Sequence, residues 1–290
     1  MNGDAYPSPL TEDKDPSPVS TPMAPSSPDP RALARGLAAF RRPNVTRSWL
    51  ELAITLLPFL ALFGLILFAV DAGYYLALLL TPLAGLFLLR IFIIQHDCGH
   101  GSFMPGKHRN NWIGRAMGVF TLTPYDCWRR SHSLHHASTG NLDARGFGDV
   151  DTLTVAEYQA LTALQRFGYR LYRHPIVLLG LGPAYLFLLR HRLPIGLMRA
   201  GWIYWISAMA TNAVAGIILL ALASQFGIAT TALVFLPVLL MAASMGVWLF
   251  YVQHQFETAH WDRKSDWSFH EAALKGSSFL DLPMPLRWFT

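Results

Sequence analysis

Histidines spaced one helical turn apart are the residues of this sequence best suited to chemistry. They occur in three stretches, QHDCGHGSF at 95–103, SHSLHH at 131–136 and YVQHQFE at 251–257. On an α-helix, side chains three or four residues apart lie on one face, so their ring nitrogens can converge on one metal ion. The candidate metal ligands are His96, His100, His132, His135, His136 and His254.

A purely structural role is the alternative for each group. A single pair four residues apart serves packing as readily as metal binding, whereas adjacent histidines with a third one turn away rarely do. The other histidines lack such spacing, and we expect them at the surface or the membrane interface, with His260 an intermediate case. This remaining set is His108, His174, His191, His260 and His270.

The pair at 96 and 100 also has the spacing of the zinc protease motif H-E-x-x-H, in which the glutamate is the general base. Asp97 stands in place of that glutamate, and its side chain is one methylene shorter. A catalytic zinc ion needs only about three protein ligands. Six imidazoles better suit two redox metal ions, and imidazole is a good ligand for iron. A membrane zinc protease is therefore the remote alternative.

Four long apolar runs must position these histidines. Hydrophobic residues make up 52% of the 290 residues and charged residues only 14%, whereas soluble domains carry about 25% charged residues. A helix needs about 20 residues to cross a ~30 Å hydrocarbon core. The runs that meet this length are 50–70, 73–94, 201–223 and 228–252. A shorter run, Pro175–Leu189, is interrupted by glycine and proline, and we expect it to be interfacial or re-entrant.

The charges between the runs predict the orientation of the chain. Neither the turn at 71–72 nor the turn at 224–227 contains lysine or arginine, whereas 41–47, the long segment 95–200 and the tail after 252 do. The positive-inside rule places both termini and the long segment in the cytoplasm. The net charge of +5 comes from these loops and not from a basic face with interleaved aromatics, so we expect no nucleic-acid partner.

The stretches HDCGHGSF, HSLHHASTGN and FYVQHQFE resemble the histidine boxes of the membrane fatty acid desaturases, and most of all those of the bacterial acyl-lipid delta-12 (omega-6) type. The resemblance runs from about Asn44 to the last residue. It implies an all-α integral membrane protein of the bacterial inner membrane, with two helical hairpins and a cytoplasmic helical cap over a histidine-rich di-iron site. Residues 31–290 would form this domain, and the Pro/Ser-rich residues 1–30 are expected to be disordered.

The resemblance also implies the reaction. Such an enzyme uses dioxygen and two electrons to insert a cis double bond into an acyl chain of a membrane lipid, with the six histidines binding two iron ions. Asp97, Asn141 and Glu257 would orient the ligands through hydrogen bonds. A separate ferredoxin or cytochrome-type donor with its reductase would supply the electrons. Related di-iron lipid hydroxylases and carotenoid ketolases are the alternatives within this architecture.

The third histidine box of the family, H-x-x-H-H, follows slightly beyond the segment that reads PLRWFT in this sequence. The residues up to Thr290 contain no such box. The resemblance therefore implies three further ligands, and a chain that ended here would be a fragment or an inactive desaturase.

Overall fold

The helices of this protein are seen in a computed structural model that describes residues 30–38, 42–146, 148 and 150–290. The described residues contain no strand, and an isolated β-bridge joins Asn141 and Asp262. The expectation of disorder for residues 1–30 lies outside the described residues, apart from Pro30, which begins the short helix α1 (Pro30–Leu37).

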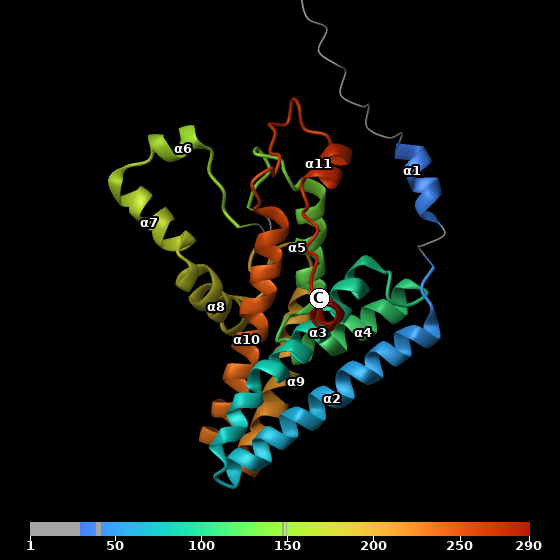
Figure 1. Cartoon of the computed structure of the whole chain (residues 1–290), viewed down its shortest axis with the longest axis vertical. Coiled ribbons are helices and arrows are strands. Elements are labelled where there is room, and N and C mark those ends of the chain that lie inside the picture. Colours follow the sequence, from blue (N-terminus) through green and yellow to red (C-terminus); the bar gives the residue numbers. More distant parts are fainter. Residues whose placement is uncertain (1–29, 39–41, 147, 149) are drawn as a thin grey trace, which may run out of the picture.

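Four helices are long and apolar enough to cross a membrane. They form two antiparallel hairpins whose turns lie at the lower end of Figure 1. This arrangement confirms the prediction of an all-helical fold with four candidate spans. The four helices are α2 (Val45–Asp71), α3 (Thr81–His100, preceded by the 3-10 helix η2, Tyr75–Leu80), α9 (Trp202–Phe226) and α10 (Ile228–His254).

The ends of these helices follow from local sequence. Asn44 caps α2, because its side-chain oxygen accepts a hydrogen bond from the backbone N–H of Arg47 at 3.0 Å. Gly227 joins α9 to α10 with a φ of +80°, a conformation that favours glycine. Gly101 ends α3 with a φ of +72°. Helix α3 therefore continues past the apolar run expected at 73–94, so that His96 and His100 lie in its last two turns.

The core lies where the two hairpins meet, between α3 and α10. Ile91 and Ile94 of α3 and Val238 of α10 are all at most 1% exposed. Gly85 lets the helices approach closely, because a Cβ atom there would lie 2.9 Å from Cγ of Met241. This close packing fixes α3, and with it the two histidines at its end, relative to α10.

The remaining helices form a cap at the end of the spans opposite the hairpin turns (Figure 1). Helix α4 packs on α3 and α9, and α5 packs on α9 and α4. Helix α7 and the apolar helix after it are bent by 60° relative to each other, as in a broken span or a re-entrant loop. The cap helices are α4 (Lys107–Phe120), α5 (Tyr125–Ser138), α6 (Val155–Ala160), α7 (Ala163–Arg173), η3 (Val177–Leu181), α8 (Gly182–Leu188), η4 (Arg190–Arg192), α11 (Phe269–Lys275) and α12 (Met284–Phe289).

Candidate metal centre

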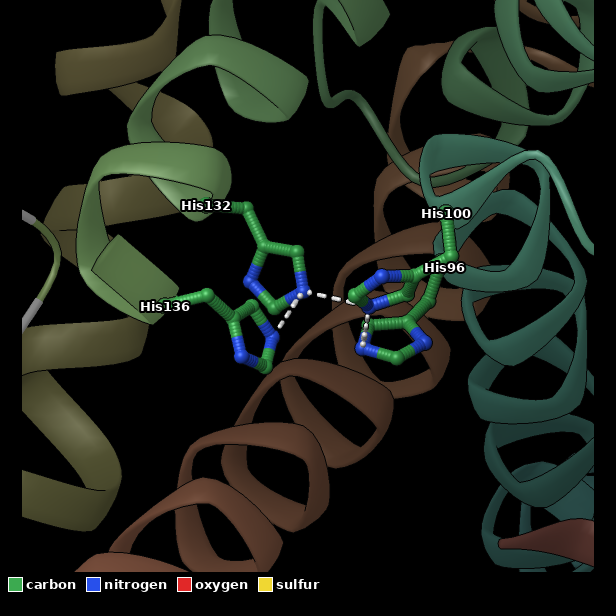
Figure 2. A group of neighbouring side chains, drawn as sticks. All are labelled: His96, His100, His132 and His136. Atoms are coloured by element: carbon green, nitrogen blue, oxygen red, sulfur yellow. Dashed lines mark hydrogen bonds between the residues drawn. The ribbon is translucent and has the colours of Figure 1, made fainter. Parts of the chain in front are cut away.

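Four histidines from two helices converge at the end of the spans. Helix α3 supplies His96 and His100, and α5 supplies His132 and His136 (Figure 2). One ring nitrogen of each lies within 4.8 Å of those of the other three. The Nε2 atom of His100 is 3.3 Å from that of His96 and 3.0 Å from that of His132, which is 3.0 Å from Nε2 of His136. We call these residues the four-histidine cluster.

The spacing of these nitrogens suits a shared metal ion. Imidazole nitrogens bind a metal such as zinc at ~2.0–2.1 Å, so two of them on one ion lie about 2.9 Å apart at a right angle and about 3.4 Å apart at the tetrahedral angle. The distances between neighbouring nitrogens in the cluster, 3.0–3.3 Å, fall within that interval. These three neighbouring pairs therefore have the spacing of ligands that share one ion.

The protonation of the cluster also favours metal binding. Burial, and then the neighbouring histidines, lower the pKa of His132 to about 2 and that of His136 to about 4. Both imidazoles are therefore neutral at pH 7 and keep a lone pair for a metal ion.

The other two candidate ligands form a separate pair beside the cluster. Nε2 of His135 lies 3.2 Å from Nε2 of His254, the last residue of α10. The Nδ1–H of His254 donates to the carbonyl oxygen of Gly276 at 3.1 Å, which leaves its Nε2 as the lone-pair nitrogen. Thr139 lies 3.4 Å from Nε2 of His135. The structure thus divides the six candidates into a cluster of four and a pair, with the His135 and His136 ring centres 5.5 Å apart.

A small cavity adjoins the pair. It has a volume of about 10 Å³ and is lined by His135, Thr139, His254 and Gly276 among others. A cavity of ~10–15 Å³ holds about one water molecule. The space at the pair therefore matches a single small ligand.

Trp128 orients the cluster, although it was not among the residues selected from the sequence. Its ring stacks on His132 with centres 4.6 Å apart and an angle of 16°, and it contacts His96 at 5.8 Å. Gly99 makes room for it, because a Cβ atom there would lie 2.7 Å from Cζ3 of Trp128. The sequence does hold a signal for this packing: a tryptophan one turn before His132, and a glycine between the two histidines of α3.

The first turn of α5 is fixed to three other helices. The hydroxyl of Tyr125, which is fully buried, donates to the carbonyl oxygen of Cys98 in α3 at 2.9 Å. Asp126 accepts two hydrogen bonds from Arg115 of α4, at 2.9 and 3.2 Å, and its backbone N–H donates to Oγ of Ser207 in α9. These contacts fix the position of α5 along the axis of α3. They thereby determine how the two cluster histidines of α5 align with the two of α3.

The three residues expected to orient ligands are placed differently. Asp97 lies next to the cluster, with Oδ1 3.4 Å from Nδ1 of His96. Asn141 is buried, and its side-chain oxygen accepts from the backbone N–H of Asp143, so it shapes a loop. Glu257 is exposed and makes no hydrogen bond or ion pair with another described residue. Of the three, the structure brings only Asp97 to a histidine.

Comparison with known proteins gives the family. The sequence model described as "Fatty acid desaturase" matches residues 72–290. A fatty acid desaturase of Bacillus subtilis (strain 168) is 42% identical over 261 residues, which cover 90% of this chain and 73% of that protein. An sn-1 acyl-lipid omega-3 desaturase (ferredoxin) of Synechocystis is 40% identical over 94 residues, and one of Nostoc is 35% identical over 152 residues.

The last two matches cover 32% and 50% of this chain and only 26% and 38% of those proteins. The family model and the Bacillus relative, by contrast, include both helices of the four-histidine cluster and the end of α10. A desaturase is an oxidoreductase, so the redox interpretation of the histidines agrees with this result and the protease alternative loses its basis. The chain belongs to the fatty acid desaturase family.

Proposed function

We propose that this protein inserts a cis double bond into an acyl chain of a membrane lipid. The observation that carries the proposal is the convergence of four imidazoles from α3 and α5 at the end of the membrane-spanning helices. An acyl chain lying between the spans would reach this end of the bundle without leaving apolar surroundings. A soluble substrate would have no need of four apolar helices around its reactive site.

The cluster and the pair would hold two iron ions. The four imidazoles of the cluster, whose neighbouring nitrogens are 3.0–3.3 Å apart, would hold one ion, and His135 with His254 would supply ligands to the second. Bound iron would allow dioxygen, two electrons and two protons to remove two hydrogens from adjacent acyl carbons, giving a double bond and two water molecules. Neutral ligands leave the charge of the iron uncompensated, which favours strong oxidation chemistry.

The protein's own residues hold this arrangement. Trp128 keeps the His132 ring in place by stacking, and the carbonyl of Gly276 fixes the tautomer of His254. Phe92 packs edge-on against Trp128, with ring centres 5.4 Å apart, and so supports the ring that stacks on His132. We assign the orienting role to Asp97 first; Asn141 would act through the loop that it shapes at Asp143, and exposed Glu257 is the third candidate.

The membrane orientation follows from the loop charges. Because the hairpin turns lack lysine and arginine, we place both termini, the cap and the site on the cytoplasmic side of the bacterial inner membrane. The electron donor would be a separate ferredoxin-type protein, as in the names of the Synechocystis and Nostoc relatives. We retain the delta-12 position as the first expectation, and those relatives make omega-3 the alternative.

The proposal is tested by expressing the full gene in a bacterial host that lacks polyunsaturated lipids. We expect a new cis double bond in the host lipids, located by mass spectrometry of the fatty acid derivatives. His136→Ala should abolish it, whereas the matched control His108→Ala, a change at an exposed histidine of α4, should not. A hydroxylated product, or a purified protein that holds zinc in place of iron, would contradict the proposal.

A further inference from the structure

A second cleft lies in the cap, away from the histidines, between α6 and α7. Its volume is about 400 Å³, and it is shallow and open on its outer side. Figure 1 shows α6 and α7 at the outer edge of the cap. The residues that line it are Leu153, Thr154, Val155, Tyr158, Tyr169, Arg170 and Arg173.

Neutral groups hold the two arginines of this cleft. The Nε–H of Arg170 donates to the hydroxyl of Tyr158 at 2.8 Å. Arg173 donates to the side-chain oxygen of Gln255 at 3.0 Å and lies 5.4 Å from the ring centre of Tyr251. Neither arginine forms an ion pair with any other described residue. Two guanidinium groups are thus oriented without a carboxylate to neutralise them.

The nearby carboxylates do not neutralise the two arginines. Glu157 of α6 is bound by Arg145 through two hydrogen bonds of 2.7 and 3.0 Å, and this pairing lowers its pKa to about 2. Asp151 contacts Arg173 through its backbone oxygen, at 3.4 Å. The cleft therefore retains a positive charge that suits an anionic group with several acceptor oxygens.

The opposite side of α7 is apolar and faces away from the protein. Leu164, Phe167 and Leu171 are 79%, 63% and 51% exposed and lie on one face of the helix. The exposed apolar surface continues beyond the 60° bend at Ile176 and Leu181, in a segment apolar enough to enter a membrane. A helix with an exposed apolar face and arginines beside it is typical of one lying in the membrane interface.

We propose that the cleft between α6 and α7 binds the phosphodiester of the membrane lipid whose acyl chain is desaturated. Arg170 and Arg173 would donate to the phosphate oxygens, while Leu164, Phe167 and Leu171 lie among the acyl chains of the same leaflet. Gln255, which holds Arg173, directly follows His254, so the phosphate site is tied to the end of α10 that carries a candidate ligand. This inference rests on the proposed function, because it assigns the head group of that substrate.

A direct binding experiment tests the site without reference to activity. The purified full-length protein is placed in phosphatidylcholine vesicles that contain either spin-labelled phosphatidylglycerol or a spin-labelled monogalactosyl lipid with the same acyl chains. We expect the protein to restrict the motion of the phosphatidylglycerol label preferentially. Arg170→Gln should reduce this preference about fivefold, the effect of about one interfacial arginine, and Arg170→Lys should retain most of it.

Arg166→Gln is the matched control, because it removes the same charge from the same helix outside the cleft. The proposal predicts less than a twofold change for this variant. Equal preference for the two lipids in the unaltered protein, or equal losses for the two variants, would overturn it. Displacement of the label by an acyl carrier protein would also overturn it, since the occupant would then be a soluble carrier.

A kinetic measurement separates this inference from the proposed function. Arg170→Gln should raise KM for phosphatidylglycerol substrate about fivefold and leave both kcat and the KM for the galactolipid unchanged. A protein that binds phosphatidylglycerol as expected but forms no double bond would refute the proposed function and leave the phosphate site standing. A protein that desaturates both lipids with the same KM would refute the site alone.

Discussion

The four-histidine cluster and the His135–His254 pair differ in how their positions are determined. The cluster joins the end of α3 to α5, and its geometry follows from two helices that pack closely through Gly99 and Trp128. The pair joins residues 119 positions apart and depends on the end of α10 and on the carbonyl of Gly276. Helical spacing thus supplies the histidines of the cluster two at a time, whereas the pair is brought together by tertiary packing alone.

The difference has a consequence for metal binding. Four imidazoles can hold an ion by themselves, because a metal such as zinc needs about three or four protein ligands. Within the described residues, the pair brings together two imidazoles and a nearby threonine hydroxyl, a smaller set of nitrogen ligands than that of the cluster. We therefore expect the cluster to bind its ion more tightly than the pair does.

The largest expected effect is on iron content, and it distinguishes the four-histidine cluster from the His135–His254 pair. His136→Ala removes a ligand from the cluster and should reduce the iron bound by the purified protein by about one ion per chain, with loss of activity. His254→Ala should also abolish activity but leave the cluster ion bound. Elemental analysis after dialysis against a weak chelator measures the difference. Once the chelator has removed the more weakly held ion of the pair, the His136→Ala protein should hold about one ion less than the His254→Ala protein. Equal iron contents at that stage would contradict tighter binding by the cluster.

The next effect concerns the packing behind the cluster. Trp128→Ala removes the ring that stacks on His132 and should lower iron affinity about 10–100-fold, the usual cost of losing a group that orients ligands. Gly99→Ala should act in the same direction, because its new methyl group would displace that ring. Titration with a competing chelator measures both affinities.

The controls for this experiment come from the same cap. Trp112→Ala, at a tryptophan that is 58% exposed on α4, should leave the iron affinity unchanged. Trp128→Phe keeps a stacking ring and should recover part of the loss. An unchanged affinity in Trp128→Ala would mean that the two helices hold the imidazoles in place without the stacking ring.

The contrast between the four-histidine cluster and the His135–His254 pair also explains what could be predicted from the sequence. The helical spacing of His96 with His100, and of His132 with His136, already indicates one face on each helix. The four spans can likewise be predicted from the sequence, because the length of an apolar run is a local property. The division of the six histidines into four and two could not be predicted, since i, i+3 and i+4 spacing within HSLHH leaves open which ring turns toward α10.

The spacing of Gly99 and Trp128 from the cluster histidines is visible in the sequence, but it does not show that the two residues touch. That contact arises only when α3 and α5 lie side by side. The end of α3 shows a similar limit. The apolar run stops near residue 94, but the helix continues to Gly101, because backbone hydrogen bonds do not depend on apolar side chains.

We expect an effect of intermediate size in the pH dependence of the folding stability of the metal-free protein. The pKa of His132 is lowered to about 2 and that of His136 to about 4, whereas an unfolded chain titrates near 6.5. Below pH 6.5 the unfolded state binds more protons than the folded state, so stability falls as the pH decreases toward 4. Above pH 6.5 these two groups contribute no pH dependence. Thermal unfolding in detergent with chelator present measures this trend.

His136→Gln provides the comparison for that measurement, because it removes one of the two shifted groups and keeps a polar side chain. As the pH is lowered from 6.5 to 4, the midpoint temperature of thermal unfolding of this variant should fall less steeply than that of the unaltered protein. Saturating metal should steepen the acid loss in both proteins, because protons then compete with the ion for the imidazoles. An identical pH slope with and without the substitution would contradict the neutral state assigned to His136.

The smallest effects are expected at the carboxylates, and they test whether the cluster needs an acidic partner. Asp97 lies 3.4 Å from His96, but 46% of its side chain is exposed, so water weakens the interaction. Asp97→Asn should therefore lower iron affinity only about two- to threefold, and Glu257→Gln, at an exposed carboxylate, should not change it. A loss comparable to that of Trp128→Ala would show that the carboxylate of Asp97, and not the packing of α5 on α3, sets the orientation of the cluster.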